Sequence, residues 1–193
     1  MHSSPPQYAL ADHLRTLGEM VAELTTEQYA SPPAGSPFSA SIGQHLRHSL
    51  DHICALMVGR TQGTVCYDRR RRGTRVESDP EECIRLLNTL EERLRKLPQS
   101  ALREGVEVEQ VLNREGDMVL VPSTIGRELV FVFHHTIHHD AMISAQMKFW
   151  GLQPAEGFGV APATLAADVL PEPTETVCVP EDSQPTVGEP ARS

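Results

Sequence analysis

Seven of the nine histidines lie in two short stretches of the chain, a distribution that indicates metal chemistry. They are His45, His48 and His52 in the first stretch, and His134, His135, His138 and His139 in the second. Two imidazoles at positions i and i+4 of a helix lie one turn apart on the same side, so both can reach one divalent ion. Three such ligands leave a coordination position open for a water or a thiol, whose pKa the ion lowers.

The second stretch lies within residues 123–150, which contain no proline and can form one long helix. On a helical wheel, His135 and His139 lie on the flank of the apolar band that would face the core. His134 and His138 point to another side of the same helix. The wheel therefore selects His135 and His139 as candidate ligands, although two hydrogen-bonded core histidines would produce the same pattern.

Apolar periodicity and turn residues predict the elements that must position these histidines. The expected elements are helices over residues 7–29, about 39–58, 80–97 and 123–150, and a β-hairpin over residues 104–121. We therefore predict an all-α fold, a four-helix bundle over residues 1–165 with a small β-hairpin between its third and fourth helices. Residues 166–193 are rich in Pro and Glu and contain no aromatic residue, so we expect a disordered acidic C-terminal tail.

The depths of the histidines in their helices allow a shared site. His48 lies about 14 Å into the second helix and His135 about 18 Å into the fourth, at 1.5 Å per residue. If the two helices run in the same direction, these imidazoles lie at similar heights.

Composition limits the classes of partner. The net charge is −9, which argues against nucleic acid as a partner. The N-terminus has no secretory signal pattern, and no apolar run is long enough to cross a membrane. The four cysteines form no C-x-x-C pair, so we expect reduced thiols in a cytoplasmic protein. The expected partner is a small-molecule substrate, and the chain could form a homodimer.

Residues 59–77 are expected to form a polar loop, and five arginines lie within its residues 69–75. These are Arg69, Arg70, Arg71, Arg72 and Arg75. A basic run of this kind is usually solvated surface. The alternative is a binding site for a carboxylate or phosphate, because guanidinium groups pair with such anions through two hydrogen bonds.

Two motifs resemble the DinB-like (DinB/YfiT-like) superfamily of metal-binding four-helix bundles. The first is S-I-G-Q-H-L-R-H-S-L-D-H, residues 41–52, in which the family's metal histidine is followed three positions later by an acid. This likeness places a ligand at His48, with Asp51 as the acid. The second is H-T-I-H-H-D, residues 135–140, which places ligands at His135 and His139. The helical wheel puts His45 and His52 nearer the apolar centre than His48, so these two remain alternative ligands.

The resemblance implies an enzyme in which a divalent ion, zinc or nickel, activates a low-molecular-weight thiol. In this hypothesis Arg69 and Arg75 bind an acidic group of the cofactor, and Arg71 and Tyr67 assist catalysis. Glu128 shares the helical line of His135 and could act as a general base or orient a ligand, but it could equally pair with an arginine. Metal-dependent hydrolysis is a second enzymatic hypothesis. A non-catalytic metal-binding or stress-associated helical protein, and a chain that binds no metal, are the alternatives.

Overall fold

The structure, a computed structural model, describes residues 5–69 and 72–169. Its helices are α1 (Pro6–Ala22), α2 (Thr26–Ala30), α3 (Ile42–Gln62), α4 (Pro80–Arg95), α5 (Ile125–Phe149) and α6 (Pro162–Leu165). Its strands are β1 (Thr64–Cys66), β2 (Gly105–Val111) and β3 (Met118–Thr124). Three 3₁₀ turns complete the described part, η1 (Arg75–Glu77), η2 (Gln99–Arg103) and η3 (Ala167–Val169). The prediction of a mostly helical chain with a small β element is confirmed, whereas the four-helix bundle stays a prediction and the β element is a three-stranded sheet.

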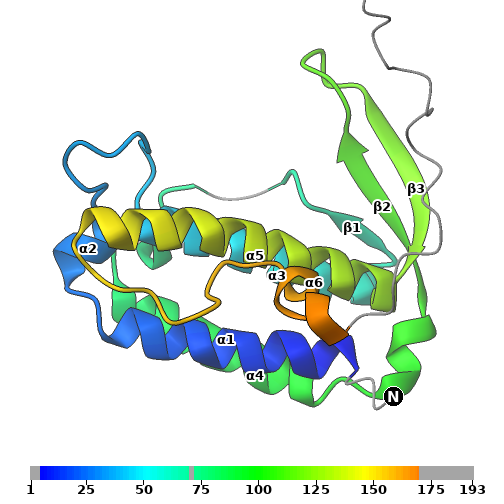
Figure 1. Ribbon diagram of the computed structural model, residues 1–193. Helices are drawn as coiled ribbons and strands as arrows, with labels where there is room; N and C mark the ends of the chain where they lie inside the picture. Colours follow the sequence, from blue (N-terminus) through cyan, green and yellow to red (C-terminus); the bar gives the residue numbers. More distant parts are fainter. Residues whose placement is uncertain (1–4, 70–71, 170–193) are drawn as a thin grey trace, which may run out of the picture. The chain divides into compact units, whose positions relative to one another are not determined.

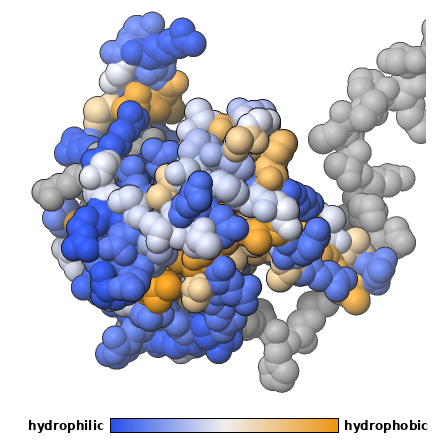
Figure 2. Space-filling view, turned by 90° about the vertical axis from the view of Figure 1, so that its left-hand side faces the viewer, coloured by the Kyte–Doolittle hydropathy of each residue, from blue (hydrophilic) through white to orange (hydrophobic). Residues whose placement is uncertain are grey.

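The long helices α1, α3, α4 and α5 lie side by side, with α1 against α4 and α3 against α5 (Figure 1). Their facing sides supply most of a buried core of Leu, Ile and Val residues. The face drawn in Figure 2 is mostly hydrophilic, with hydrophobic residues visible in patches. This separation is the expected result of burying the apolar side of each amphipathic helix.

The ends of α3 follow from local sequence signals. Ser41 caps its first turn in a capping box, because its side chain accepts from the Gln44 amide and the Gln44 side chain accepts from the Ser41 amide. The helix continues four residues past the predicted end at Val58 and stops at Gly63, whose φ of 83° favours glycine. The helix thus has the length to carry three histidines on one side.

The first predicted helix is two helices in the structure. Residues 7–29 were expected to be continuous, but α1 ends at Ala22 and α2 begins at Thr26. Thr25 caps α2 through a capping box with Gln28, which makes a new helix start more favourable than continuation.

The predicted simple hairpin is also corrected, because the sheet has three strands in the order β1–β2–β3. β2 and β3 pair antiparallel, close to the predicted residues 104–121, and β1 pairs parallel to β2. β1 has only three residues and directly follows α3, so its sequence carries no period-2 signal. Val65 of β1 is fully buried and packs close to Gly59 of α3, which attaches the sheet to the helices.

The chain divides into two compact units, Met1–Ala161 and Pro162–Ser193. Of the second unit the structure describes the short α6 and η3. The predicted disordered tail, residues 166–193, falls mostly on residues 170–193, which lie outside the described residues. Among the helices that the structure describes, none combines the length and apolarity needed to cross a membrane.

Candidate functional site

The helices α3 and α5 run antiparallel, so that residues early in α3 face residues late in α5 (Figure 1). His45 contacts His139 at one end of this interface, and His52 lies near Phe131 at the other. The parallel orientation considered from the sequence is therefore wrong. The histidines meet because the levels of His48 and His135 coincide when the helices run in opposite directions.

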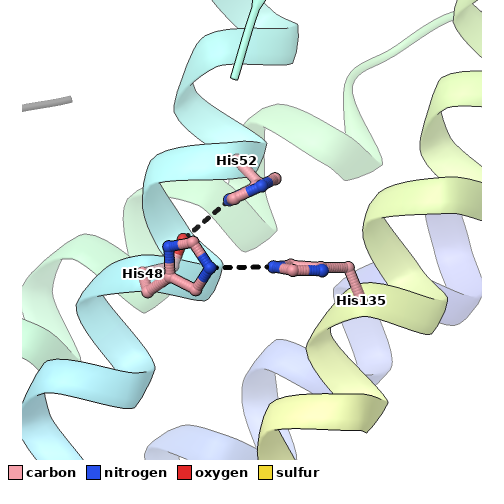
Figure 3. Close-up of side chains that lie close together, drawn as sticks. All are labelled: His48, His52 and His135. Carbon is pink, nitrogen blue, oxygen red and sulfur yellow. Dashed lines mark hydrogen bonds between the residues drawn. The ribbon is translucent and has the colours of Figure 1, made fainter. Parts of the chain in front are cut away.

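Three imidazoles from the two helices converge in a tight group, which Figure 3 shows. Its members are His48 and His52 of α3 and His135 of α5, and one nitrogen of each lies within 4.8 Å of the others. The Nε2 atoms of His48 and His135 are 3.1 Å apart. The rings of His52 and His135 are stacked, with their centroids 4.1 Å apart.

This group fits the requirements of a metal site. Two ligands of a tetrahedral zinc ion with Zn–N bonds of 2.0–2.1 Å are separated by about 3.3 Å, close to the separation of the His48 and His135 nitrogens. The Nδ1 atom of His52 lies 2.9 Å from the backbone oxygen of His48. A proton on Nδ1 then donates to that carbonyl and leaves Nε2 as the coordinating atom, the arrangement common in metal-binding histidines. The three imidazoles can therefore hold a divalent ion.

His139, a predicted ligand, lies next to this group but is not one of its three members. Its ring is buried, and its Nδ1 is 3.1 Å from Nδ1 of His45. Burial, together with the neighbouring His135 and His45, lowers the pKa of His139 to about 3. Burial and His138 also lower the pKa of His45. His139 is therefore neutral at pH 7, the form that can bind a metal.

The helical wheel separates the remaining histidines of α5 correctly. His134 and His138 are exposed, whereas His139 is buried and His135 is partly buried. His45 and His52 are more buried than His48, as the wheel also predicts. These differences in exposure provide matched control positions on the same helix.

Glu128 and Tyr67 form a buried polar network beside the three histidines. The Tyr67 hydroxyl donates to one Glu128 oxygen at 2.7 Å, and Ser123 and Arg127 donate to the other at 2.6 and 2.9 Å. Burial and the hydrogen bond to Glu128 raise the pKa of Tyr67. The Tyr67 ring also stacks on His52, with the planes 13° apart. The network therefore holds the Tyr67 ring against the His52 ring. The Tyr67 hydroxyl is already bonded to the Glu128 carboxylate.

The described arginines among the predicted anion-binding residues pair with separate acidic side chains. Arg69 forms an ion pair with Glu109 at 2.6 Å, and Arg75 forms one with Asp79 at 2.7 Å. Arg71 lies outside the described residues. Arg72 lines a hollow beside the histidines, although nothing in its sequence context distinguishes it from the three arginines before it.

This hollow has a volume of about 350 Å³, and we call it the histidine pocket. It is lined by Ala40, Gln44, His45, Arg47, His48, Arg72, Glu77 and His139. His48 belongs to the group of three imidazoles, so the pocket gives a small molecule access to the candidate metal site. Arg47 is mostly buried in the wall and forms ion pairs with Asp51 and Glu77.

Sequence reasoning also missed a buried contact between a histidine and a carboxyl group on the other side of α5. Asp140 is fully buried, and one of its oxygens lies 2.6 Å from Nε2 of His13 on α1. Burial raises the pKa of Asp140 in spite of this partner. The pair ties α1 to the turn of α5 that carries His139. No spacing in the sequence indicates it, because the two residues are 127 positions apart.

The low pKa of His139 predicts how the stability of the metal-free protein depends on pH. Because the folded-state pKa is below the ordinary value of 6.5, the native state binds fewer protons than the unfolded state. The free energy of unfolding should then fall as the pH drops from about 6.5 toward 3, by up to about 1.4 kcal/mol per pH unit. Urea titrations in chelator should show a smaller slope for His139→Asn. The control His134→Asn should keep the wild-type slope, and equal slopes for all three proteins would contradict the prediction.

Comparison with known proteins places this architecture in a family. The family model of the DinB superfamily matches residues 9–143, which include α3, α4, β2, β3 and most of α1 and α5. FK506-binding protein 5 of Rhizopus delemar is 31% identical over 119 residues, which are 59% of this chain and 30% of that protein. The chain thus spans less than a third of the length of this relative. The family match covers well over half of the chain and contains the three converging histidines, and the chain therefore belongs to the DinB superfamily.

Proposed function

We propose that the chain is a metal-dependent enzyme that activates a small thiol at the site formed by His48, His52 and His135. The convergence of three imidazole nitrogens within 4.8 Å carries this proposal. Nitrogen ligation suits zinc or nickel. His48 and His135 are ligands in this proposal, and His52 is favoured as the third because its Nδ1 lies beside a backbone carbonyl. His139, the third ligand suggested by the resemblance to the family, is the alternative.

A divalent ion at this site supplies the chemistry by lowering the pKa of a thiol, so that a thiolate is present at neutral pH. The thiol loses its proton to the solvent, and its sulfur forms a bond to an electrophilic carbon. A leaving group departs from that carbon with the electron pair of the broken bond. The chain contributes the histidine pocket, which brings the thiol and the electrophile together beside His48.

Tyr67 and Glu128 act as positioning residues in this proposal. Tyr67 stacks on His52, and its hydroxyl is held by the buried Glu128 carboxylate. This arrangement fixes the ring against which His52 rests.

Tyr67→Phe is expected to destabilise the protein by about 1–2 kcal/mol, because a buried Glu128 oxygen loses its donor. The variant keeps the ring that stacks on His52, so its metal content should stay at the wild-type level. Urea unfolding and elemental analysis measure the two effects. The control is Tyr8→Phe, at a position that is 38% exposed, and it should change stability by less than about 0.5 kcal/mol. Equal stability of the two variants would show that the bond to Glu128 contributes nothing.

The activity is tested by incubating the metal-loaded protein with candidate thiols and a chlorinated nitrobenzene, and by measuring the thioether adduct and the released chloride. We expect adduct formation that requires both the metal and His48, because the thiolate forms only at the loaded site. His134→Ala should retain the activity, since this side chain is exposed. Metal binding without any metal-dependent adduct would support the alternative of a non-catalytic metal-binding protein.

A further inference from the structure

The histidine pocket contains an uneven set of charges. Three of its lining residues carry formal charge, Arg47, Arg72 and Glu77. Glu77 is bonded inside the wall, because one of its oxygens lies 2.9 Å from Nε of Arg47 and accepts from the Gly73 amide at 2.8 Å. Arg47 is in turn paired with both Glu77 and Asp51. Glu77, the acidic residue among the described lining residues, is therefore already bonded to the protein.

Arg72 differs from every other arginine of the basic loop that the structure describes. Its side chain is exposed at the pocket, and none of the ion pairs formed within residues 5–69 and 72–169 involves it. Arg69 is paired with Glu109 and lines a separate hollow with Cys54 and Cys66. Arg75 is paired with Asp79. Among the residues that the structure describes, the pocket thus presents the unpaired cation of Arg72 on its rim and the imidazoles of His48 and His139 in its wall.

We propose that Arg72 is the anion-binding residue of the histidine pocket, and that the ligand of this site is a small molecule that carries a carboxylate. This inference rests on the proposed function, to which it adds the class of ligand. A guanidinium binds a carboxylate through two parallel hydrogen bonds, which fixes the direction of the ligand as well as its position. The carboxylate lies at Arg72, and the reacting end of the ligand points toward His48.

The size of the pocket supports a small ligand. A volume of about 350 Å³ is near the lower end of the range for small-molecule sites, about 300–1,000 Å³. A ligand of that size with a carboxylate at one end and a thiol at the other can reach Arg72 and the histidines together. Its orientation would be set by the charge of Arg72 on the rim, since the Glu77 carboxylate of the wall is occupied by Arg47 and the Gly73 amide.

The test compares two thiols that differ only in the charged end, 3-mercaptopropionate and 3-mercapto-1-propanol. Calorimetric titration of the zinc-loaded full chain should show about tenfold tighter binding of the carboxylate. Arg72→Gln should reduce this ratio to near one. The matched control Arg69→Gln should keep the wild-type ratio, because Arg69 lines a different hollow. A ratio that Arg72→Gln leaves unchanged would overturn the proposal, and so would the absence of binding heat with both thiols.

A second measurement separates this inference from the proposed function. In the cobalt-loaded protein, coordination by sulfur produces a sulfur-to-cobalt charge-transfer band in the near ultraviolet. If neither thiol produces this band, thiol activation fails, while the calorimetric ratio still decides the role of Arg72. If both thiols produce the band but bind equally well to wild type and Arg72→Gln, thiol activation stands and Arg72 is not the anion-binding residue.

Discussion

Replacing His48 and His135 together by alanine is expected to abolish metal binding, from about one divalent ion per chain to nearly none. These two residues supply two of the three converging imidazoles, with nitrogens 3.1 Å apart on facing helices. Without them the group of three keeps only His52, and the nearby pair of His45 and His139, whose Nδ1 atoms are also 3.1 Å apart, lies outside that group. Elemental analysis of untagged protein, after exposure to zinc or nickel and removal of the excess, measures the change.

The control for this experiment is His134→Ala with His138→Ala, which removes two exposed histidines from α5. This variant should bind metal as the wild type does. Metal should also raise the melting temperature of the wild type and of the control, because an ion that binds only the native state stabilises it by mass action. Full metal content in the variant without His48 and His135, or none in the wild type, would disprove the site.

Single variants decide which histidine is the third ligand. His52→Ala should weaken metal binding strongly if the group of three in the structure is the ligand set. His139→Ala should do so if the family resemblance is the better guide. Both side chains are mostly buried, so stability is measured on the metal-free proteins to separate lost ligation from lost packing. The weaker binder of the two variants identifies the ligand.

Much of this site could be predicted from sequence because helical periodicity reports which side of a helix is buried. The wheel separates the inward His139 from the exposed His134 and His138 on one helix without any knowledge of the partner helix. It cannot report the relative direction of two helices, and here α3 and α5 run antiparallel. The contact of His48 with His135 depends on that direction, and so it required the structure.

The parts that sequence could not predict involve contacts between distant segments. β1 is a three-residue strand that exists because it pairs with β2 about 40 residues later, and its own sequence has no strand period. Four consecutive arginines cannot be distinguished by type, yet Arg69 and Arg72 line different hollows. The capped ends of α3 and α4, by contrast, are local and match the signals at Ser41 and Asp79.

Gly43→Ala is expected to destabilise the protein by about 2 kcal/mol, although alanine is the better helix former. A Cβ at Gly43 would lie 2.3 Å from the Glu77 carbonyl oxygen and 2.6 Å from Cε1 of Tyr29. Neither group can move easily, because Tyr29 is fully buried and its hydroxyl donates to the Val76 oxygen. The segment that contains η1 must therefore shift away from α3.

The matched control is Gly18→Ala in α1, where a Cβ would meet no atom within 4 Å. This substitution should stabilise the protein by about 0.5–1 kcal/mol, since it only raises helix propensity. Opposite signs for the changes in unfolding free energy of the two glycine variants in urea would confirm that close packing at Gly43 is the cause.

Glu77 both contacts Gly43 and pairs with Arg47 in the wall of the histidine pocket, so Gly43→Ala should also weaken binding of 3-mercaptopropionate. A variant that loses neither stability nor binding would show that α3 and η1 can separate without cost to the pocket.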